Sequence, residues 1–174
     1  GGFVVSEDDL NNEKIQNLNV QFEFNSGHDL LEISNKNNLS FSEIIWHNEK
    51  TINPDVSIKT KLMMIWNTMD ECIKRGLSSD SVLSGALKVN RRAPKLYQLL
   101  LIEGKPNPVN LMDWVNVWAI AVNEENASGG KIVTAPTNGA AGIIPAVIKY
   151  YDEFIERDYQ KGIENFLLTA GAIG

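Results

Sequence analysis

The chain has 174 residues, enough for one domain or for parts of two, and its apolar and charged fractions, 43% and 22%, are ordinary for a globular protein. Its formal net charge of −6 and the lack of long Lys and Arg runs argue against a nucleic-acid partner held by phosphate contacts. No apolar stretch approaches the roughly 20 residues of a membrane span, and the first ten residues lack a signal-peptide pattern, so we expect a cytoplasmic protein without a membrane partner.

The first 24 residues are expected to form β structure. Residues 1–5 are a short apolar run after two glycines, and residues 19–24 alternate between apolar and polar side chains. A two-stranded hairpin is marginal by itself, so the two runs indicate the last part of a larger sheet. We therefore expect a short β-hairpin that is the remnant of an α+β domain lying mainly before residue 1.

Helical patterns begin at residue 26. Ser26 with Asp29 is an N-cap pair for a short helix ending near residue 38. Ser40 with Glu43 has the spacing of a capping box, in which each residue bonds the backbone of the other. This second pair predicts another short helix over residues 41–50.

A long amphipathic helix is predicted over residues 54–75. Asn53 would be its N-cap, Pro54 its first residue and Gly76 its C-terminal stop. Apolar side chains recur at spacings of three and four along it, as in a helix with one buried face. They are Ile58, Leu62, Ile65, Trp66, Met69 and Ile73.

Residues 77–95 look irregular, although Ala93-Pro94 restarts a helix that runs to residue 102. Three further helices are predicted over residues 110–127, 142–156 and 163–174. The first of these is apolar around most of its circumference, which indicates deep burial. The last is expected to run through Gly174 without a cap.

These patterns together predict a mainly α chain with two parts. Residues 1–38 would be the end of the N-terminal α+β domain and a linker. Residues 39–174 would be the first part of an all-α domain.

The loop at residues 126–142 carries the strongest functional signal. Its glycines let a ligand approach the backbone, and its hydroxyl and amide side chains offer neutral hydrogen bonds. A helix that begins at its end would direct free N–H groups toward a bound anion, so the loop predicts a small-anion or amino-acid site. The candidate binding residues are Ser128, Gly129, Gly130, Thr134, Thr137, Asn138 and Gly139. Among them, we expect Thr137 and Asn138 to contact the ligand directly.

Other interpretations of this loop stay open. Glycines also permit a tight connection between two closely packed helices. The loop lacks the GK[ST] sequence of a phosphate-binding P-loop and does not match GxGxxG. A pyridoxal-phosphate site would need Lys131 as its Schiff-base lysine, but nothing else supports that role, so we expect no pyridoxal phosphate.

Polar residues near this loop could support the site. A carboxylate buried at the end of the helix over residues 110–127 could act as an acid or a base, and Arg91 and Arg92, with Lys95, could clamp a carboxylate. A solvated helix end and a surface ion cluster are the alternatives. The possible supporting residues are Asn123, Glu124, Asn126, Arg91 and Arg92.

No catalytic residue is identified in this chain. Cys72 is its only cysteine, which excludes an internal disulfide and any cluster held by several of its own cysteines. We expect Cys72 to pack as a small apolar side chain. His28 and His47 lie apart on short polar helices, where surface or capping roles are expected.

Residues 116–156 closely resemble the catalytic-domain signature of the bacterial iron–sulfur L-serine dehydratases, L-serine ammonia-lyases that do not use pyridoxal phosphate. The resemblance covers essentially the whole chain, since further segments follow in the family's order. These segments are GGFVV, HNEK, IWNTMDECIKRGLS, LKVNRRAP and FLLTAGAIG.

The resemblance implies that the parent enzyme converts L-serine into pyruvate and ammonia, that it is a homodimer, and that residues 39–174 belong to its catalytic domain. It also implies a 4Fe–4S cluster, held by three cysteines, that acts as a Lewis acid on the serine hydroxyl.

The resemblance also implies where the cluster ligands lie. In the family the three cysteines come after the position of Gly174, and a Ser-Ser-His-Thr-type motif precedes residue 1. We therefore expect an internal fragment that carries the substrate loop, binds no cluster and is inactive alone. Ala141 stands where some relatives have cysteine, so this position is not a required ligand.

Two other functions compete with this one. The chain could be a helical module that binds a small ligand without turnover. It could also belong to a related lyase that acts on another β-substituted amino acid, such as cysteine, because the loop does not distinguish these substrates.

Overall fold

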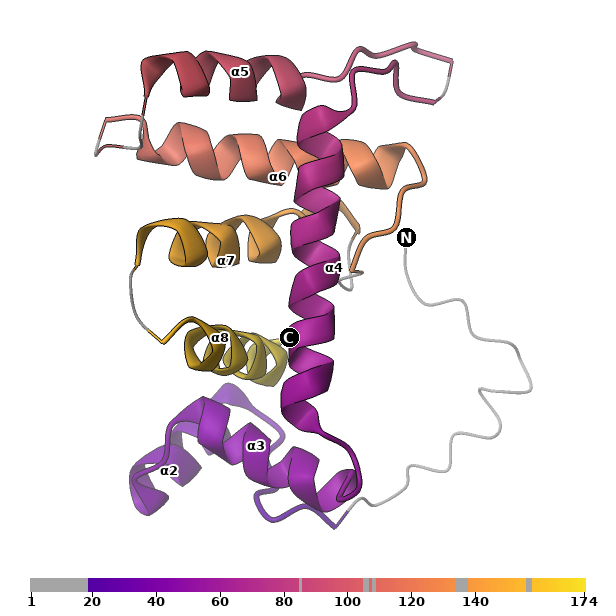
Figure 1. Cartoon of the computed structure of the whole chain (residues 1–174). Helices are drawn as coiled ribbons and strands as arrows, with labels where there is room; N and C mark the ends of the chain where they lie inside the picture. Colours follow the sequence, from indigo (N-terminus) through magenta and orange to yellow (C-terminus); the bar gives the residue numbers. More distant parts are fainter. Residues whose placement is uncertain (1–18, 85, 105–106, 108, 134–137, 156–157) are drawn as a thin grey trace, which may run out of the picture. The chain divides into compact units, whose positions relative to one another are not determined.

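A computed structural model describes residues 19–84, 86–104, 107, 109–133, 138–155 and 158–174. This part of the chain is mainly helical, as predicted (Figure 1). Its elements are α2 (Gly27–Asn37), α3 (Phe41–Ile52), α4 (Ile58–Ser78), α5 (Ala93–Glu103), α6 (Leu111–Ala127), the short 3-10 helix η1 (Asn138–Ala140), α7 (Ile143–Phe154) and α8 (Tyr159–Ile173). They form two compact units, one from residues 64–155 and one from residues 19–63 and 158–174.

The unit of residues 64–155 is built around α6. Helices α5 and α7 pack on either side of it, and the later part of α4 crosses the layer (Figure 1). Side chains that are buried along one broad face of α6 form the centre of the core, including Val117, Trp118 and Ala121, and partly buried residues beside this face pack against it. The Trp118 ring also stacks on Phe154 of α7, with ring centroids 5.9 Å apart. The predicted deep burial of this helix is confirmed.

The other unit contains α2, α3, α8 and the start of α4. Both predicted caps are present: the Ser26 hydroxyl accepts from Asp29 N–H at 3.1 Å, and Ser40 and Glu43 form a complete capping box. Each cap satisfies backbone N–H groups that have no partner within the helix.

The start of α8 differs from the prediction. The helix starts at Tyr159, before the predicted residue 163, and Asp158 accepts a hydrogen bond from Lys161 N–H at its N-terminus. The helix is assigned as far as Ile173, and the Gly174 N–H donates to Ala170 O at 3.1 Å. This bond continues the ordinary i→i−4 helical pattern to the last residue of the sequence, so the structure does not contradict the predicted uncapped end.

Residues 19–25 show no strand in the structure, and the remainder of the predicted β-hairpin lies outside the described residues. The backbone of Phe22 is instead paired with a side chain of α3. Its N–H donates to Asn48 Oδ1 at 2.9 Å, and its carbonyl accepts from Asn48 Nδ2 at 2.7 Å. The Asn48 amide therefore satisfies the backbone groups that a strand partner would otherwise bond.

The start of α4 differs from the prediction. Asn53 ends α3, with its N–H donating to Glu49 O at 2.8 Å, so the assignment of Asn53-Pro54 as a helix start is wrong. Proline is common just after a helix C-terminus, because it cannot continue the preceding helix, and this explains Pro54 equally well. The helix begins at Ile58, where the Ser57 hydroxyl accepts from Thr60 N–H at 3.4 Å.

The predicted stop of α4 at Gly76 is also wrong, because the helix continues to Ser78. The glycine serves the packing of α4 on α6. A Cβ at position 76 would lie 2.7 Å from the carbonyl carbon of Ala121 and 2.8 Å from its Cβ, and closer still to its carbonyl oxygen. Gly76 therefore permits close contact between two helix backbones, which periodicity along one helix does not reveal.

An ion-pair cluster joins α4 to α7 within this unit. Lys149 Nζ lies 3.1 Å from Asp70 Oδ1 and 2.9 Å from Glu153 Oε1, and Asp70 also pairs with Lys74. Burial by itself would raise the pKa of Asp70, but hydrogen bonds from Lys74 and Lys149 outweigh it and hold this pKa below its usual value. The ionised carboxylate therefore stabilises the folded chain.

The lowered pKa of Asp70 predicts a specific dependence of stability on pH. An acid whose pKa is depressed by folding contributes stability above its unfolded pKa, and that contribution is lost as the pH falls through the folded pKa. Asp70→Asn should therefore be less stable than the wild type near pH 7, and the difference should shrink between about pH 5 and about pH 2. Urea unfolding of both proteins across this pH range tests the prediction. A difference in the free energy of unfolding that does not change with pH would show that the charge of Asp70 does not stabilise the folded state.

Candidate functional site

The predicted loop begins with a tight turn at the end of α6, over residues 128–131. Gly129 has φ +73°, a left-handed conformation that glycine adopts without strain. The Gly130 N–H donates to Glu125 O at 2.8 Å, which turns the chain back on the last turn of the helix. A Cβ at Gly130 would lie 2.7 Å from Glu125 Oε2, so the backbone passes directly against this carboxylate.

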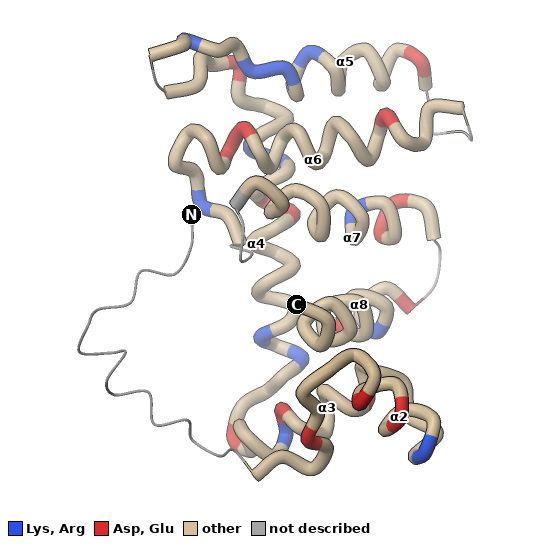
Figure 2. The backbone as a smooth tube through the Cα atoms, turned by 180° about the vertical axis from the view of Figure 1, so that it is seen from behind, with Lys and Arg blue, Asp and Glu red and all other residues tan. Residues whose placement is uncertain are grey.

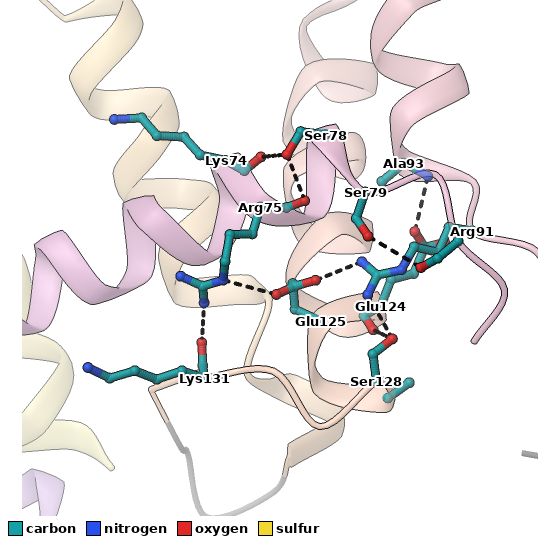
Figure 3. Close-up of polar contacts among 12 residues, drawn as sticks. Lys74, Arg75, Ser78, Ser79, Arg91, Ala93, Glu124, Glu125, Ser128 and Lys131 are labelled. Atoms are coloured by element: carbon teal, nitrogen blue, oxygen red, sulfur yellow. Dashed lines mark hydrogen bonds and ion pairs between the residues drawn. The ribbon is translucent and has the colours of Figure 1, made fainter. Parts of the chain in front are cut away.

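Glu125 lies at the centre of an ionic network (Figure 3). Its Oε1 accepts from Arg91 Nη1 at 2.7 Å, and its Oε2 accepts from Arg75 Nε at 3.1 Å. Its side chain is only 7% exposed and that of Arg91 is 4% exposed, while Arg75 reaches the surface. Charge-assisted bonds to two arginines compensate for burying this carboxylate.

The same arginines also hold the turn. Arg91 Nη2 donates to Ser128 Oγ at 2.8 Å, and Arg75 Nη2 donates to Lys131 O at 2.6 Å (Figure 3). The Ser128 hydroxyl in turn donates to Glu124 O at 2.9 Å. Both ends of the turn are therefore tied to side chains that come from other segments of the chain.

Glu124 fixes the start of α5. Its carboxylate accepts from the backbone N–H groups of Arg92 at 2.8 Å and Ala93 at 3.2 Å. A carboxylate in this position satisfies N–H groups that lack partners within the helix and faces the positive end of the helix dipole. In Figure 2 the basic residues before α5 and the acidic residues near the end of α6 lie on the same side of this unit.

The structure brings together several of the predicted residues. Ser128, Gly129, Gly130, Arg91 and Glu124 all belong to the turn and its network. Since Glu124 and Glu125 are buried, the end of α6 is not a solvated one. The Arg91 guanidinium is bonded to Glu125 and Ser128, and Arg92 contributes mainly its backbone N–H.

The other predicted residues are placed differently. Thr134 and Thr137 lie outside the described residues. Asn138 begins η1, and Gly139 is exposed with open space where a Cβ would stand. Asn123 is exposed and Asn126 is partly buried. The roles of these residues in binding remain predictions.

A helix does begin where the loop ends, as predicted. Helix α7 starts at Ile143 after Gly142, and no side chain of the described residues caps its N-terminus. A Cβ at Gly142 would lie 2.6 Å from Ala119 O, so this end of α7 packs closely on α6. Only two residues separate the end of η1 from the start of α7, so the N–H groups at the N-terminus of α7 lie close in sequence to Asn138 and Gly139.

Two residues that matter in this network, Glu125 and Arg75, are not among the candidate residues that the sequence predicts. The available signal was a pair of adjacent acids at the end of a helix that is otherwise apolar enough to be buried. Buried acids require partners, so the sequence could have predicted that basic side chains pair with these two glutamates, although it does not identify which ones.

The described residues do not fit an iron–sulfur cluster. Cys72 is the only cysteine of the chain, and burial raises the pKa of its thiol to about 11, so it is protonated and poorly suited to bind iron. Within the described ranges, no group of three or more His, Cys, Asp or Glu side chains is arranged to hold a metal ion. His28 is exposed and lies 3.3 Å from Glu32, and His47 contacts the Phe22 ring.

A cavity of about 390 Å³ lies in the other unit, among α3, α8 and the start of α4. Its charged groups serve the fold: Glu43 completes a capping box, Asp158 caps α8, and Glu164 lies 3.8 Å from Lys59. None of the predicted site residues lines it. None of the described helices has the length and apolar composition that crossing a membrane requires.

Comparisons with known proteins identify the family of this chain. Residues 36–174 match the family described as Serine dehydratase alpha chain. Over its full length the chain is 43% identical to an L-serine dehydratase of Streptomyces coelicolor, 42% identical to L-serine dehydratase 1 of Escherichia coli and 40% identical to an L-serine dehydratase of Helicobacter pylori. It covers 38%, 39% and 39% of these relatives. The chain belongs to the serine dehydratase alpha chain family.

Proposed function

We propose that this chain supplies the substrate loop of an L-serine ammonia-lyase, and that the complete protein converts L-serine into pyruvate and ammonia. The observation that carries the proposal is the family match over residues 36–174, joined to full-length identity with proteins named L-serine dehydratase. Because the chain spans about 39% of the length of those relatives, the activity belongs to the complete protein.

We assign two tasks to the residues of the loop. Ser128, Gly129 and Gly130 shape the turn, since the Ser128 hydroxyl already bonds Arg91 and Glu124. Thr134, Thr137, Asn138 and Gly139 are proposed to contact the substrate, whose carboxylate would face the N-terminus of α7. The N–H groups at a helix N-terminus stabilise the negative charge of a carboxylate. Neutral hydroxyl and amide side chains can orient the substrate through hydrogen bonds.

The resemblance to the iron–sulfur enzymes implies a 4Fe–4S cluster in the complete protein, where it would supply a Lewis acid for the departure of the serine hydroxyl. The three cysteines that such a cluster needs are not present among the 174 residues. We therefore propose that this chain contributes substrate contacts and loop geometry, while the cluster ligands come from residues of the complete protein beyond Gly174.

The remaining expectations are part of this proposal. A boundary near residue 38 between an α+β domain and the all-α catalytic domain is supported by the family match, which begins at residue 36. A homodimeric assembly and a cytoplasmic location follow from the resemblance to the iron–sulfur enzymes.

Substitution of Asn138 tests the proposed substrate contact. In the protein expressed from the complete reading frame, Asn138→Ala should raise the KM for L-serine about tenfold, because one hydrogen bond to a charged substrate is worth about 1.5 kcal/mol. Its melting temperature should stay close to that of the wild type. Steady-state pyruvate formation and thermal unfolding measure the two effects.

Asn165→Ala is the matched control, since Asn165 is exposed on α8 in the other unit. Its KM should equal that of the wild type. A loss of stability in Asn138→Ala without a change in KM would indicate a packing role instead. Turnover of L-cysteine with none of L-serine would favour the related lyase, and binding of L-serine without any turnover would favour the binding module.

A further inference from the structure

We propose that Glu125 is a positioning residue for the substrate loop, acting through Arg75 and Arg91. This inference rests on the proposed function, because it concerns the same loop. Glu125 makes no proposed contact with the substrate. Its carboxylate fixes two arginines, and each arginine holds one end of the turn over residues 128–131.

The first step is the pairing of the charges. Arg91 and Arg75 bind different oxygens of the same carboxylate, at 2.7 and 3.1 Å, so two guanidinium groups approach each other at a largely buried position. Like charges at such a position repel strongly unless an anion lies between them. Glu125 supplies this anion and thereby sets the positions of both guanidinium groups.

In the second step, the two arginines that Glu125 fixes hold the two ends of the turn. Arg91 reaches Ser128 Oγ at 2.8 Å with its second amino group, and Arg75 reaches Lys131 O at 2.6 Å with its own. The separation of the two ends of the turn is therefore set by the two arginines. Figure 3 shows a continuous series of contacts from the Lys131 carbonyl through the side chains of Arg75, Glu125 and Arg91 to Ser128.

The third step is a direct contact with the turn itself. The backbone carbonyl of Glu125 accepts from Gly130 N–H at 2.8 Å, and its Oε2 occupies the space beside the Gly130 Cα. The carboxylate thus meets the middle of the turn as well as the groups at both ends. A displacement of about 1 Å in a substrate-positioning loop can cost about 100-fold in rate, so this bracing has a functional consequence.

A buried glutamate elsewhere in the chain separates this role from a general effect on stability. Glu164 of α8 has the same exposed fraction as Glu125, 7% of its side chain, and it also has a basic partner, Lys59, at 3.8 Å. It lies in the other unit, whereas the turn belongs to the unit of residues 64–155. Glu164→Gln therefore reports what neutralising a buried carboxylate does to the fold alone.

The experiment compares Glu125→Gln, Glu125→Asp and Glu164→Gln with the wild type, in the protein from the complete reading frame. Two quantities are measured: kcat and KM for L-serine, and the rate of tryptic cleavage after Lys131. The second readout does not need activity, because Arg75 bonds the carbonyl of the peptide bond that trypsin would cleave. Arg75→Met gives a further test in which the Glu125–Arg91 pair is kept.

In Glu125→Gln we expect KM to rise about tenfold or more and cleavage after Lys131 to accelerate about tenfold, because one arginine loses its acceptor and the turn opens more often. Glu125→Asp keeps the charge and should recover most of both losses. Arg75→Met should accelerate cleavage as Glu125→Gln does, and Glu164→Gln should leave both quantities within about twofold of the wild type.

Equal changes in Glu125→Gln and Glu164→Gln would overturn the positioning role, as would unchanged cleavage in Arg75→Met. If Glu125→Gln does not fold, Glu125→Asp and Arg75→Met still decide the question. If the wild type makes no pyruvate from L-serine, the proposed function fails, while the cleavage rates still test whether Glu125 holds the turn.

Discussion

Replacing Gly76 with alanine is expected to lower the free energy of unfolding by about 2–3 kcal/mol, although alanine favours helices over glycine by about 1 kcal/mol. The added Cβ would lie 2.7 Å from the carbonyl carbon of Ala121 and would also meet its carbonyl oxygen. Both are backbone atoms of α6, so the collision cannot be relieved by rotating a side chain. Urea unfolding of the variant measures the loss.

Gly171→Ala is the matched control for this substitution. Gly171 lies inside α8, and no atom approaches within 4 Å of the position that its Cβ would take. This variant should gain about 0.5–1 kcal/mol, because alanine loses less conformational entropy in a helix. A gain in stability for both variants would show that α4 and α6 do not pack as closely as the structure shows.

Replacing Arg91 with methionine is expected to lower the free energy of unfolding by about 3–5 kcal/mol, since it leaves a buried carboxylate without its closer cation. Arg91 is 4% exposed and donates to Glu125 at 2.7 Å and to Ser128 at 2.8 Å. Methionine replaces the apolar stem of arginine and removes its guanidinium group, so the loss reports that group and its contacts. Chemical denaturation at neutral pH measures it.

The neighbouring arginine provides the comparison. The Arg92 side chain is 70% exposed, and its Nε lies 3.7 Å from Glu124 Oε1. Because exposed ion pairs contribute little, Arg92→Met should change the free energy of unfolding by no more than about 1 kcal/mol. Equal losses in Arg91→Met and Arg92→Met would contradict the assignment of Arg91 to a buried network.

The helices with strong local signals were predictable from the sequence. Ser26 and the Ser40–Glu43 capping box mark helix starts through residues that lie three positions apart, so no knowledge of the tertiary structure is needed. The burial of α6 was also readable, because its apolar side chains surround the helix.

The ends of α4 were not predictable in the same way. Pro54 is compatible with a helix start and with the residue after a helix end, and the local sequence does not choose between them. Gly76 suits a C-terminal stop and also a close helix crossing, and the choice depends on Ala121, 45 positions along the chain. Local patterns leave both pairs of alternatives equally consistent.

The candidate site was predictable in position but not in its internal contacts. The glycine- and amide-rich composition of residues 126–142 identified the loop. Arg75 and Glu125 are 50 positions apart, and Arg91 and Glu125 are 34 apart. Only the folded chain, in which α4 approaches α6 at Gly76 and α5 packs on α6, brings their charges together. The sequence around each of these residues does not identify its partner.

The proposed activity is tested by pyruvate formation from L-serine, measured on the protein from the complete reading frame after anaerobic reconstitution with iron and sulfide. The account predicts a brown, oxygen-sensitive protein that releases pyruvate and ammonia, whereas the 174-residue chain alone, with one cysteine, stays colourless. A folded complete protein that remains colourless and releases no pyruvate would contradict it.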